Sequence, residues 1–278
     1  MDPHSLTWVD SIILGIVQGL TEFLPVSSDG HLVLARHLLN YQKEILVFDV
    51  LLHMGTLGSL FFVFYKDTLN LISDFRLLIK DFFKSPIKAI LNPKHKFLLF
   101  VLITTFVTGI VGLVFEKAIT ELFTSMAAAG LGFACTSVFL FWGAFQSSGQ
   151  KRVTEMKWSF PILIGLAQAL ALLPGASRSG STIALALVLS VHKNEAGRYS
   201  FIVAIPIIAL ASLYQMRHLF SGEHEALNIM TIGVVTAFII GIFAIRLLLW
   251  MLERQKLLPF AIYTGLLAVF CLVYASIY

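Results

Sequence analysis

The sequence predicts an all-α integral membrane protein, an inverted repeat with two re-entrant helical hairpins and about six full transmembrane crossings. Three observations predict this fold class. The chain of 278 residues is 58% hydrophobic and only 13% charged, with a mean hydropathy of +0.86, whereas soluble domains are about half apolar and about a quarter charged. Apolar runs of about 20 residues recur along the chain, and the basic residues gather in particular loops.

The apolar runs give six full crossings. A transmembrane helix needs about 20 predominantly apolar residues, and such runs lie at residues 48–65, 97–115, 126–145, 201–216, 229–250 and 259–277. Cys135 and Cys271 fall within these runs, where a thiol packs as a small hydrophobe, so we expect no disulfide framework. No Lys or Arg precedes Arg36, so the apolar run before it lacks the basic start of a secretory signal, and we expect the mature protein to keep it.

The distribution of Lys and Arg sets the orientation. One segment interleaves seven of them with Leu, Ile and Phe, as is typical of an amphipathic helix on an anionic leaflet. They are Lys66, Arg76, Lys80, Lys84, Lys88, Lys94 and Lys96. The positive-inside rule makes this segment cytoplasmic, and counting from it puts both termini outside, in the periplasm or the extracellular space. Seven further basic residues then lie inside, namely Lys151, Arg152, Lys157, Lys193, Arg198, Arg254 and Lys256.

The outer loops keep only Lys117 and Arg217. The formal net charge of +4 is thus explained by basic residues that gather in cytoplasmic loops beside the membrane. We therefore expect membrane lipids and no nucleic acid as partners.

Two further stretches, residues 8–39 and 160–191, must each enter and leave on one side for this count to hold. Each consists of two short predicted helices around a polar centre that contains a proline. Irregular backbone at membrane depth is tolerated only where protein or a water-filled cavity satisfies its polar groups. We therefore predict two re-entrant hairpins whose centres mark a site and do not face lipid.

The two hairpins resemble each other at a constant offset of 150 residues. The matched pairs are Gly15 and Gly165, Gln18 and Gln168, Leu20 and Leu170, Ser27 and Ser177, Gly30 and Gly180, and Leu39 and Leu189. A second echo joins Thr104, Phe106, Gly109 and Ile110 to Thr236, Phe238, Gly241 and Ile242. We expect a single membrane domain over residues 1–278, with repeat 1 at about 8–145 and repeat 2 at about 159–278. Three crossings per half invert the second copy, so the hairpins are expected to enter from opposite faces and meet near the midplane.

The centre of the first hairpin gathers a carboxylate, two hydroxyls and an imidazole. Gln18 and Glu22 are four residues apart and share a helix face, and Ser27 or Ser28 can cap the next helix, which carries His31. Ionisable groups inside membrane segments are costly and functional by default, which favours a functional Glu22 over a structural carboxylate. For each serine, capping and catalysis explain the sequence equally well.

The centre of the second hairpin combines hydroxyls, glycines and a guanidinium at the start of an apolar helix. Backbone N–H groups, a helix N-terminus and an arginine fork are the groups that bind phosphate. No carboxylate lies near Arg178 in the sequence, which favours a ligand over a structural partner. We predict an anion cradle made of Arg178, Ser177, Ser179, Gly180 and Thr182.

These motifs resemble the signatures of the undecaprenyl-diphosphate phosphatase (bacitracin resistance protein) family. The resemblance rests on QGLTE at residues 18–22, FLPVSSDGH at 23–31 and PGASRSGST at 174–182, and it extends over essentially the whole chain, including PFAIY at 259–263. It implies hydrolysis of undecaprenyl (C55 isoprenyl) diphosphate to undecaprenyl phosphate and phosphate, in the bacterial cytoplasmic (inner) membrane. This reaction recycles the lipid carrier for peptidoglycan and other envelope polymers.

By resemblance, four residues occupy the proposed catalytic positions: Glu22, Ser28, His31 and Arg178. We expect Gln18 and Ser27 to contact the substrate. Two residues depart from the commoner pattern, because Gln18 stands where Glu is more usual and Asp29 where Thr is.

A mechanism follows as a hypothesis. Arg178 and backbone N–H groups hold the diphosphate, Ser28 attacks the terminal phosphorus or positions the attacking water, and His31 transfers the proton. Glu22, alone or through Mg²⁺ or Ca²⁺, orients the imidazole or neutralises phosphate charge, although no motif fixes a metal. The polyprenyl tail is expected between helices, in contact with lipid.

A rival comes from another class of protein. Inverted repeats with broken helices also build transporters, so the chain could be a lipid-phosphate flippase or an anion transporter. A transporter needs the anion cradle but no Glu, Ser and His beside it, and the sequence therefore favours the enzyme.

For His53, in the first full crossing, the sequence favours a hydrogen-bonded histidine between helices over a cavity residue. A homodimer is left open.

Overall fold

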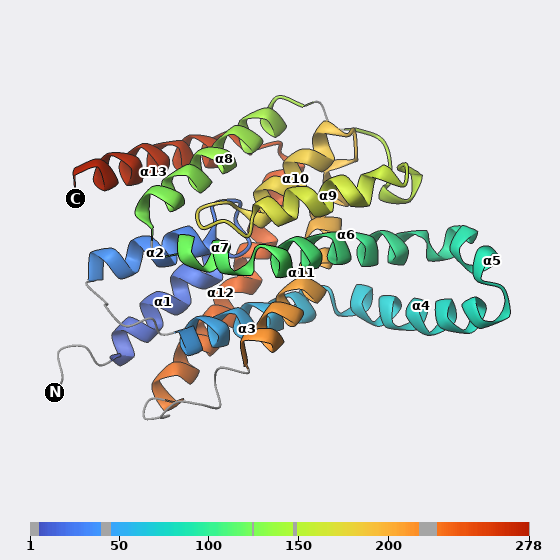
Figure 1. Ribbon diagram of the computed structural model, residues 1–278, viewed down its shortest axis with the longest axis horizontal. Coiled ribbons are helices and arrows are strands. Elements are labelled where there is room, and N and C mark those ends of the chain that lie inside the picture. Colours follow the sequence, from blue (N-terminus) through green and yellow to red (C-terminus); the bar gives the residue numbers. More distant parts are fainter. Residues whose placement is uncertain (1–5, 40–45, 124, 147–148, 217–226, 278) are drawn as a thin grey trace.

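The computed structural model describes residues 6–39, 46–123, 125–146, 149–216 and 227–277 (Figure 1). Over these ranges the regular structure is helical, with one isolated β-bridge between Lys151 and Val191. The all-α prediction is confirmed. Arg217, which we expected in an outer loop, lies outside the described ranges.

Five helical stretches of the described chain are long and apolar enough to cross a membrane. They contain α6 (Lys96–Val114) with the preceding 3₁₀ turn η1 (Pro93–His95), α8 (Met126–Ala144), α11 (Lys193–Met216), α12 (Leu227–Glu253) and α13 (Leu258–Ile277). A sixth span results if α3 (Leu46–Val63) and α4 (Tyr65–Lys84), which are bent by 85°, count together. Each predicted crossing overlaps one of these spans, so the chain is a multi-pass membrane protein.

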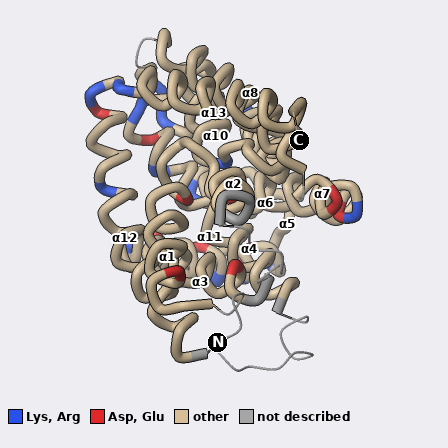
Figure 2. The backbone as a smooth tube through the Cα atoms, turned by 90° about the vertical axis from the view of Figure 1, so that its left-hand side faces the viewer, with Lys and Arg blue, Asp and Glu red and all other residues tan. Residues whose placement is uncertain are grey.

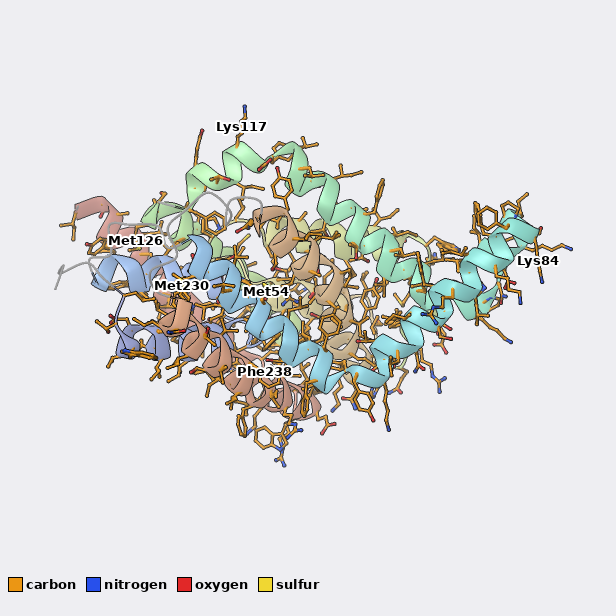
Figure 3. All side chains as sticks on the ribbon, turned by 90° about the horizontal axis from the view of Figure 1, so that it is seen from below. Met54, Lys84, Lys117, Met126, Met230 and Phe238 are labelled. Atoms are coloured by element: carbon orange, nitrogen blue, oxygen red, sulfur yellow. The ribbon has the colours of Figure 1, made fainter. Side chains whose placement is uncertain are left out.

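The basic segment extends over α4, the short α5 (Pro86–Leu91) and η1 to the first residue of α6. Figure 3 shows α3 and α4 as the arms of a wide V, with Lys84 at the far tip of α4 and away from Lys117. Leu78, Ala89 and Leu98 form a small buried cluster that ties α4 to α5 and α6. Because of the 85° bend, α4 runs across the direction of α3 and does not continue it.

The short α7 (Glu116–Leu122) follows directly on α6. Figure 2 shows it standing apart from the body and carrying charges of both signs, which belong to Lys117, Glu116 and Glu121. Lys117 therefore follows the opposite end of α6 from Lys96.

Two helix pairs correspond to the predicted hairpins. The first is α1 (Trp8–Thr21) with α2 (Ser28–Leu39), and the second is α9 (Ser159–Leu170) with α10 (Arg178–Val188). The two members of each pair contact each other, and Figure 1 shows each second helix folding back along the first. We call residues 22–27 the first break and residues 171–177 the second break.

Local sequence explains where these helices begin and end. At the start of α1, Asp10 N donates to the Thr7 hydroxyl (3.2 Å) and Thr7 N donates to the Asp10 carboxylate (3.0 Å), which is a capping box. Proline lacks an N–H and constrains the residue before it, and each break contains one, Pro25 or Pro174. The chain is therefore forced out of helix at both sites.

The ends of the two hairpins meet. A methyl group added to Gly30 would lie 2.7 Å from Cα of Gly175, so these two backbones are in direct contact. The Ser179 hydroxyl donates to the carbonyl of Leu24 in the first break (3.4 Å). Two segments that are far apart in the sequence thus form one site.

Helix α8 packs directly against the backbone of the second break. Gly175 has a φ of +83°, in the left-handed region that favours glycine, and a Cβ on Gly132 would lie 2.0 Å from the carbonyl oxygen of Pro174. The Thr136 hydroxyl donates to Gly175 O (3.0 Å) and accepts from Ser177 N (2.8 Å). The position of the first turn of α10 is therefore set by α8.

Candidate active site

The site is centred on Glu22, which follows the last turn of α1. Gln18 and Glu22 share a helix face as predicted, and Gln18 Nε2 donates to Glu22 Oε2 (3.1 Å). The Glu22 side chain is only 6% exposed and the whole of Gln18 is buried. A buried carboxylate requires positive charge and hydrogen-bond donors around it.

The two serines of the first hairpin have different surroundings. Ser27 caps α2, since its hydroxyl accepts from Gly30 N (3.3 Å), and it has a φ of +71°, which is unusual for a residue other than glycine. The Ser28 hydroxyl instead donates to Glu22 Oε2 (2.7 Å). Ser28 is therefore the serine whose oxygen has a base within reach, which is the arrangement of an activated nucleophile.

The second hairpin contributes Arg178, the first residue of α10. Its Nη2 donates to Glu22 Oε1 (2.9 Å), so the two hairpins are joined by an ion pair. Its other terminal nitrogen, Nη1, is buried and has no hydrogen-bond partner within the described part of the chain. Buried guanidinium N–H groups are normally satisfied, and an unsatisfied one beside a serine and a carboxylate is a donor suited to an anionic ligand.

The other predicted cradle residues hold the turn together. Ser177 is the N-cap of α10 and accepts from Gly180 N (3.1 Å), and the Ser177 and Ser179 hydroxyls lie 3.3 Å apart. Thr182 Oγ1 donates to Arg178 O (2.8 Å) and also lies 2.7 Å from the Ser200 hydroxyl. Their contact with substrate remains a prediction, because the bonds that these side chains make are to protein atoms.

His31 makes its hydrogen bonds to Ser27 and Tyr263 and not to Glu22, Ser28 or Arg178 among the described residues. Its Nδ1 lies 2.7 Å from the Ser27 carbonyl, which can only accept, so Nδ1 carries the proton and Nε2 of the neutral ring accepts from the Tyr263 hydroxyl (2.7 Å). The Tyr263 ring stacks on the imidazole, with 5.7 Å between centroids. No hydrogen bond between His31 and Ser28 is found in the described residues, so the hydroxyl meets Glu22 and not the imidazole.

Two residues of this region were not assigned to it from the sequence. Tyr263 belongs to the PFAIY string, which was the available signal, although it lies 232 residues from His31. His53 of α3 directs Nε2 at two carboxylates, 3.6 Å from Glu22 Oε2 and 3.8 Å from Asp29 Oδ1. Its hydrogen bond goes to Asp49 O of its own helix (2.8 Å), not to another helix as the sequence favoured.

A metal ligand set is not evident. Over the ranges that the structure describes, no three His, Cys, Asp or Glu side chains are grouped so that they could hold a metal ion. The suggested contact of Glu22 with Mg²⁺ or Ca²⁺ therefore stays a prediction about the complex with substrate.

Comparison with known proteins identifies the family. The family model described as bacitracin resistance protein BacA matches residues 11–270. The chain belongs to this family. A relative from Alkaliphilus metalliredigens, named undecaprenyl-diphosphatase, is 37% identical over 93% of this chain and 95% of its own length. Relatives of the same name from Methanosphaera stadtmanae and Korarchaeum cryptofilum are 36% and 37% identical, over 95% and 91% of this chain and 97% and 94% of their own lengths.

Family membership confirms what the motifs resembled. The matched region includes both breaks and the PFAIY string, so every residue of the Glu22 cluster lies inside it. Some members are archaeal, and membership alone therefore does not fix a bacterial source.

Proposed function

We propose that this BacA-family protein hydrolyses undecaprenyl diphosphate to undecaprenyl phosphate and phosphate. One observation carries the proposal: the Glu22 carboxylate binds the Ser28 hydroxyl on Oε2 and the Arg178 guanidinium on Oε1, which leaves Arg178 Nη1 available to an anion. The names of the full-length relatives support the substrate. The product is a lipid carrier for peptidoglycan and other envelope polymers, so this activity would recycle that carrier.

The contacts suggest a separate role for each side chain of the site. Arg178 Nη1 donates to the terminal phosphate, and Ser28 Oγ attacks its phosphorus while the Ser28 proton passes to Glu22 Oε2. The bond from phosphorus to the bridging oxygen breaks, undecaprenyl phosphate leaves, and water then hydrolyses the phosphoserine. His31 can take part in proton transfer only after its Nε2 leaves the Tyr263 hydroxyl.

Phosphate release tests the proposal. Purified protein in detergent should release phosphate from undecaprenyl diphosphate, because no closed compartment exists there and transport cannot contribute. A protein that releases none in detergent but moves the lipid phosphate across a vesicle membrane would be a flippase, and the proposed hydrolysis would be wrong.

A divalent cation is a separate proposal. If Mg²⁺ or Ca²⁺ bridges Glu22 and the diphosphate, exhaustive chelation should abolish turnover and either ion should restore it. Full turnover after chelation would show that protein groups alone neutralise the charge of the phosphate.

We further propose that both hairpins are re-entrant, enter from opposite faces and form one membrane domain with both termini outside the cytoplasm. The contact between Gly30 and Gly175 and the folding back of α2 and α10 in opposite directions support this arrangement (Figure 1). The perpendicular course of α4 supports a location on the cytoplasmic leaflet. A cysteine at Lys80 should react with an impermeant thiol reagent only after the membrane is opened, and labelling from outside would overturn the orientation. The proposed location is the bacterial cytoplasmic membrane, in which the protein acts either as a monomer or as a homodimer.

A further inference from the structure

Helix α12 exposes one side along its described length. Its exposed residues recur every three or four positions, which is the spacing of one side of an α-helix. Between positions 235 and 250 they are Val235, Ile239, Phe243, Arg246, Leu247 and Trp250. Arg246 is the only charged residue of the sequence between Asn228 and Glu253. The outer side of α12 is therefore apolar, as expected for a surface that faces lipid, and it carries one cation.

This cation has no partner in the part of the chain that the structure describes. Arg246 makes no hydrogen bond and no ion pair there. Arg198, near the start of the span formed by α11, is different: its Nε donates to Asp67 Oδ1 (3.1 Å), and its Nη1 lies 3.5 Å from Glu195 Oε1. Charged groups inside membrane segments are costly unless they are paired or reach the polar boundary. Arg246 therefore needs a partner that the described chain does not supply.

The depth of Arg246 suits a lipid headgroup. It stands seven residues before Glu253, the last residue of α12, which is about 10 Å along a helix axis. An arginine at this distance can direct its guanidinium to the membrane boundary while its methylene groups stay in lipid. Trp250, one turn further on and 45% exposed, marks that boundary, because tryptophan is enriched at the level of the headgroups. Phosphate groups and water meet the guanidinium there.

Two further cations gather at Trp250. The Arg254 guanidinium lies 4.4 Å from the centroid of its ring, and Lys256 Nζ lies 5.8 Å from it. Glu253 is the carboxylate of this segment, and no ion pair joins it to these cations among the described residues. Figure 2 shows lysine and arginine gathered at this end of the molecule, above the label of α12. Three cations against one carboxylate attract an anion to this surface.

We propose that this end of α12 binds an anionic glycerophospholipid, whose phosphate accepts from Arg246 and whose acyl chains lie along Phe243 and Leu247. A guanidinium binds a phosphate through two N–H groups at once, which suits a charge held at one place on a helix. Arg254 and Lys256 add the attraction that favours an anionic over a zwitterionic headgroup. Because phospholipids make up the bulk of the membrane, mass action favours them over the much scarcer undecaprenyl lipids.

The inference goes beyond the proposed hydrolysis and does not depend on it. The other side of α12 packs on α1 and α3, the helices that carry Glu22 and His53. The proposed lipid therefore lies on the outside of the helix, apart from the Glu22 cluster.

Lipid binding by the full-length protein in a nonionic detergent tests the proposal. Native mass spectrometry counts bound phosphatidylglycerol, phosphatidylcholine or undecaprenyl phosphate as each is titrated. Arg246→Leu should bind phosphatidylglycerol about tenfold more weakly than wild type, the loss expected for a charge-assisted hydrogen bond, and Arg246→Lys should fall between the two. Lys117→Leu is the matched control, because it removes one positive charge from an exposed residue of α7, and it should leave this affinity unchanged. Binding of undecaprenyl phosphate should not respond to Arg246→Leu.

Leucine suits a position that faces lipid, so Arg246→Leu should fold, and its unfolding midpoint without added lipid checks this. Should it not fold, Arg246→Lys alone carries the comparison. The inference is overturned if these variants bind phosphatidylglycerol as tightly as wild type, if Lys117→Leu loses as much, or if phosphatidylcholine binds equally well. It is also overturned if undecaprenyl phosphate depends on Arg246 as strongly as phosphatidylglycerol does. A protein without phosphate release would leave the lipid site standing, so the two proposals fail separately.

Discussion

The two breaks share a serine that caps the following helix, and they differ in the side chain that comes directly after this cap. Ser27 and Ser177 lie 150 residues apart, and each caps the next helix by accepting from a glycine N–H three residues on, at 3.3 Å from Gly30 and 3.1 Å from Gly180. The residue directly after the cap is Ser28 in one hairpin and Arg178 in the other. Both bind Glu22, one on each oxygen. The repeat therefore supplies two equivalent positions, and the site uses one for a hydroxyl and the other for a cation.

The backbones of the two breaks also differ. In the second break the left-handed residue is Gly175, at a φ of +83°, and the cap Ser177 has an ordinary φ of −87°. In the first break the cap itself, Ser27, takes the left-handed conformation at +71°. A side chain there costs roughly 1–2 kcal/mol. The first break is thus the strained one, and it is the one that carries the serine proposed to react.

The largest effect should come from the residue after the first cap. Ser28→Ala removes the hydroxyl that donates to Glu22, and we expect turnover to fall by about a thousandfold or more if that oxygen attacks phosphorus. Ser27→Ala should keep a measurable share of turnover, because its hydroxyl serves the cap. Rates of phosphate release for the two variants, measured side by side, decide which serine is the nucleophile. The reverse ranking would move the nucleophile to Ser27.

The equivalent residue after the second cap should have the next largest effect. Arg178→Lys keeps a positive charge beside Glu22 but loses the planar fork, so one nitrogen can no longer bind Glu22 while the other binds phosphate. We expect kcat to fall on the order of a hundredfold, as when one preorganised donor is lost, with folding retained. Separate kcat and KM values are needed. A change confined to KM would mean that Arg178 binds substrate and transition state equally.

The smallest effect should appear when the two caps are exchanged for glycine. Ser27→Gly and Ser177→Gly lose the same hydrogen bond and gain the same freedom in the unfolded chain, but only Ser27→Gly relieves a left-handed side chain. We expect Ser27→Gly to be the more stable variant by about 1 kcal/mol. Unfolding midpoints in the same detergent measure this difference. Equal midpoints would show that Ser27 holds its conformation without strain.

The sequence predicted the elements of this comparison better than the contacts between them. Spans, breaks and the shared helix face of Gln18 and Glu22 follow from apolar run length, proline and helical periodicity, which are local properties. The pairing of Arg178 with Glu22, and of His31 with Tyr263, depends on how distant helices pack. His53 shows the same limit, because its position on α3 is local but its approach to Asp29 is tertiary.

The backbone contact between α8 and the second break bears on how the ligand is received. With Gly132 against Pro174 and Thr136 bonded on both sides of the turn, the segment before Arg178 has no space in which to shift. An arriving diphosphate would therefore meet a nearly rigid receptor, and only the arginine side chain would have to adjust. Little conformational entropy would be lost on binding, and more of the interaction would remain for the reaction itself.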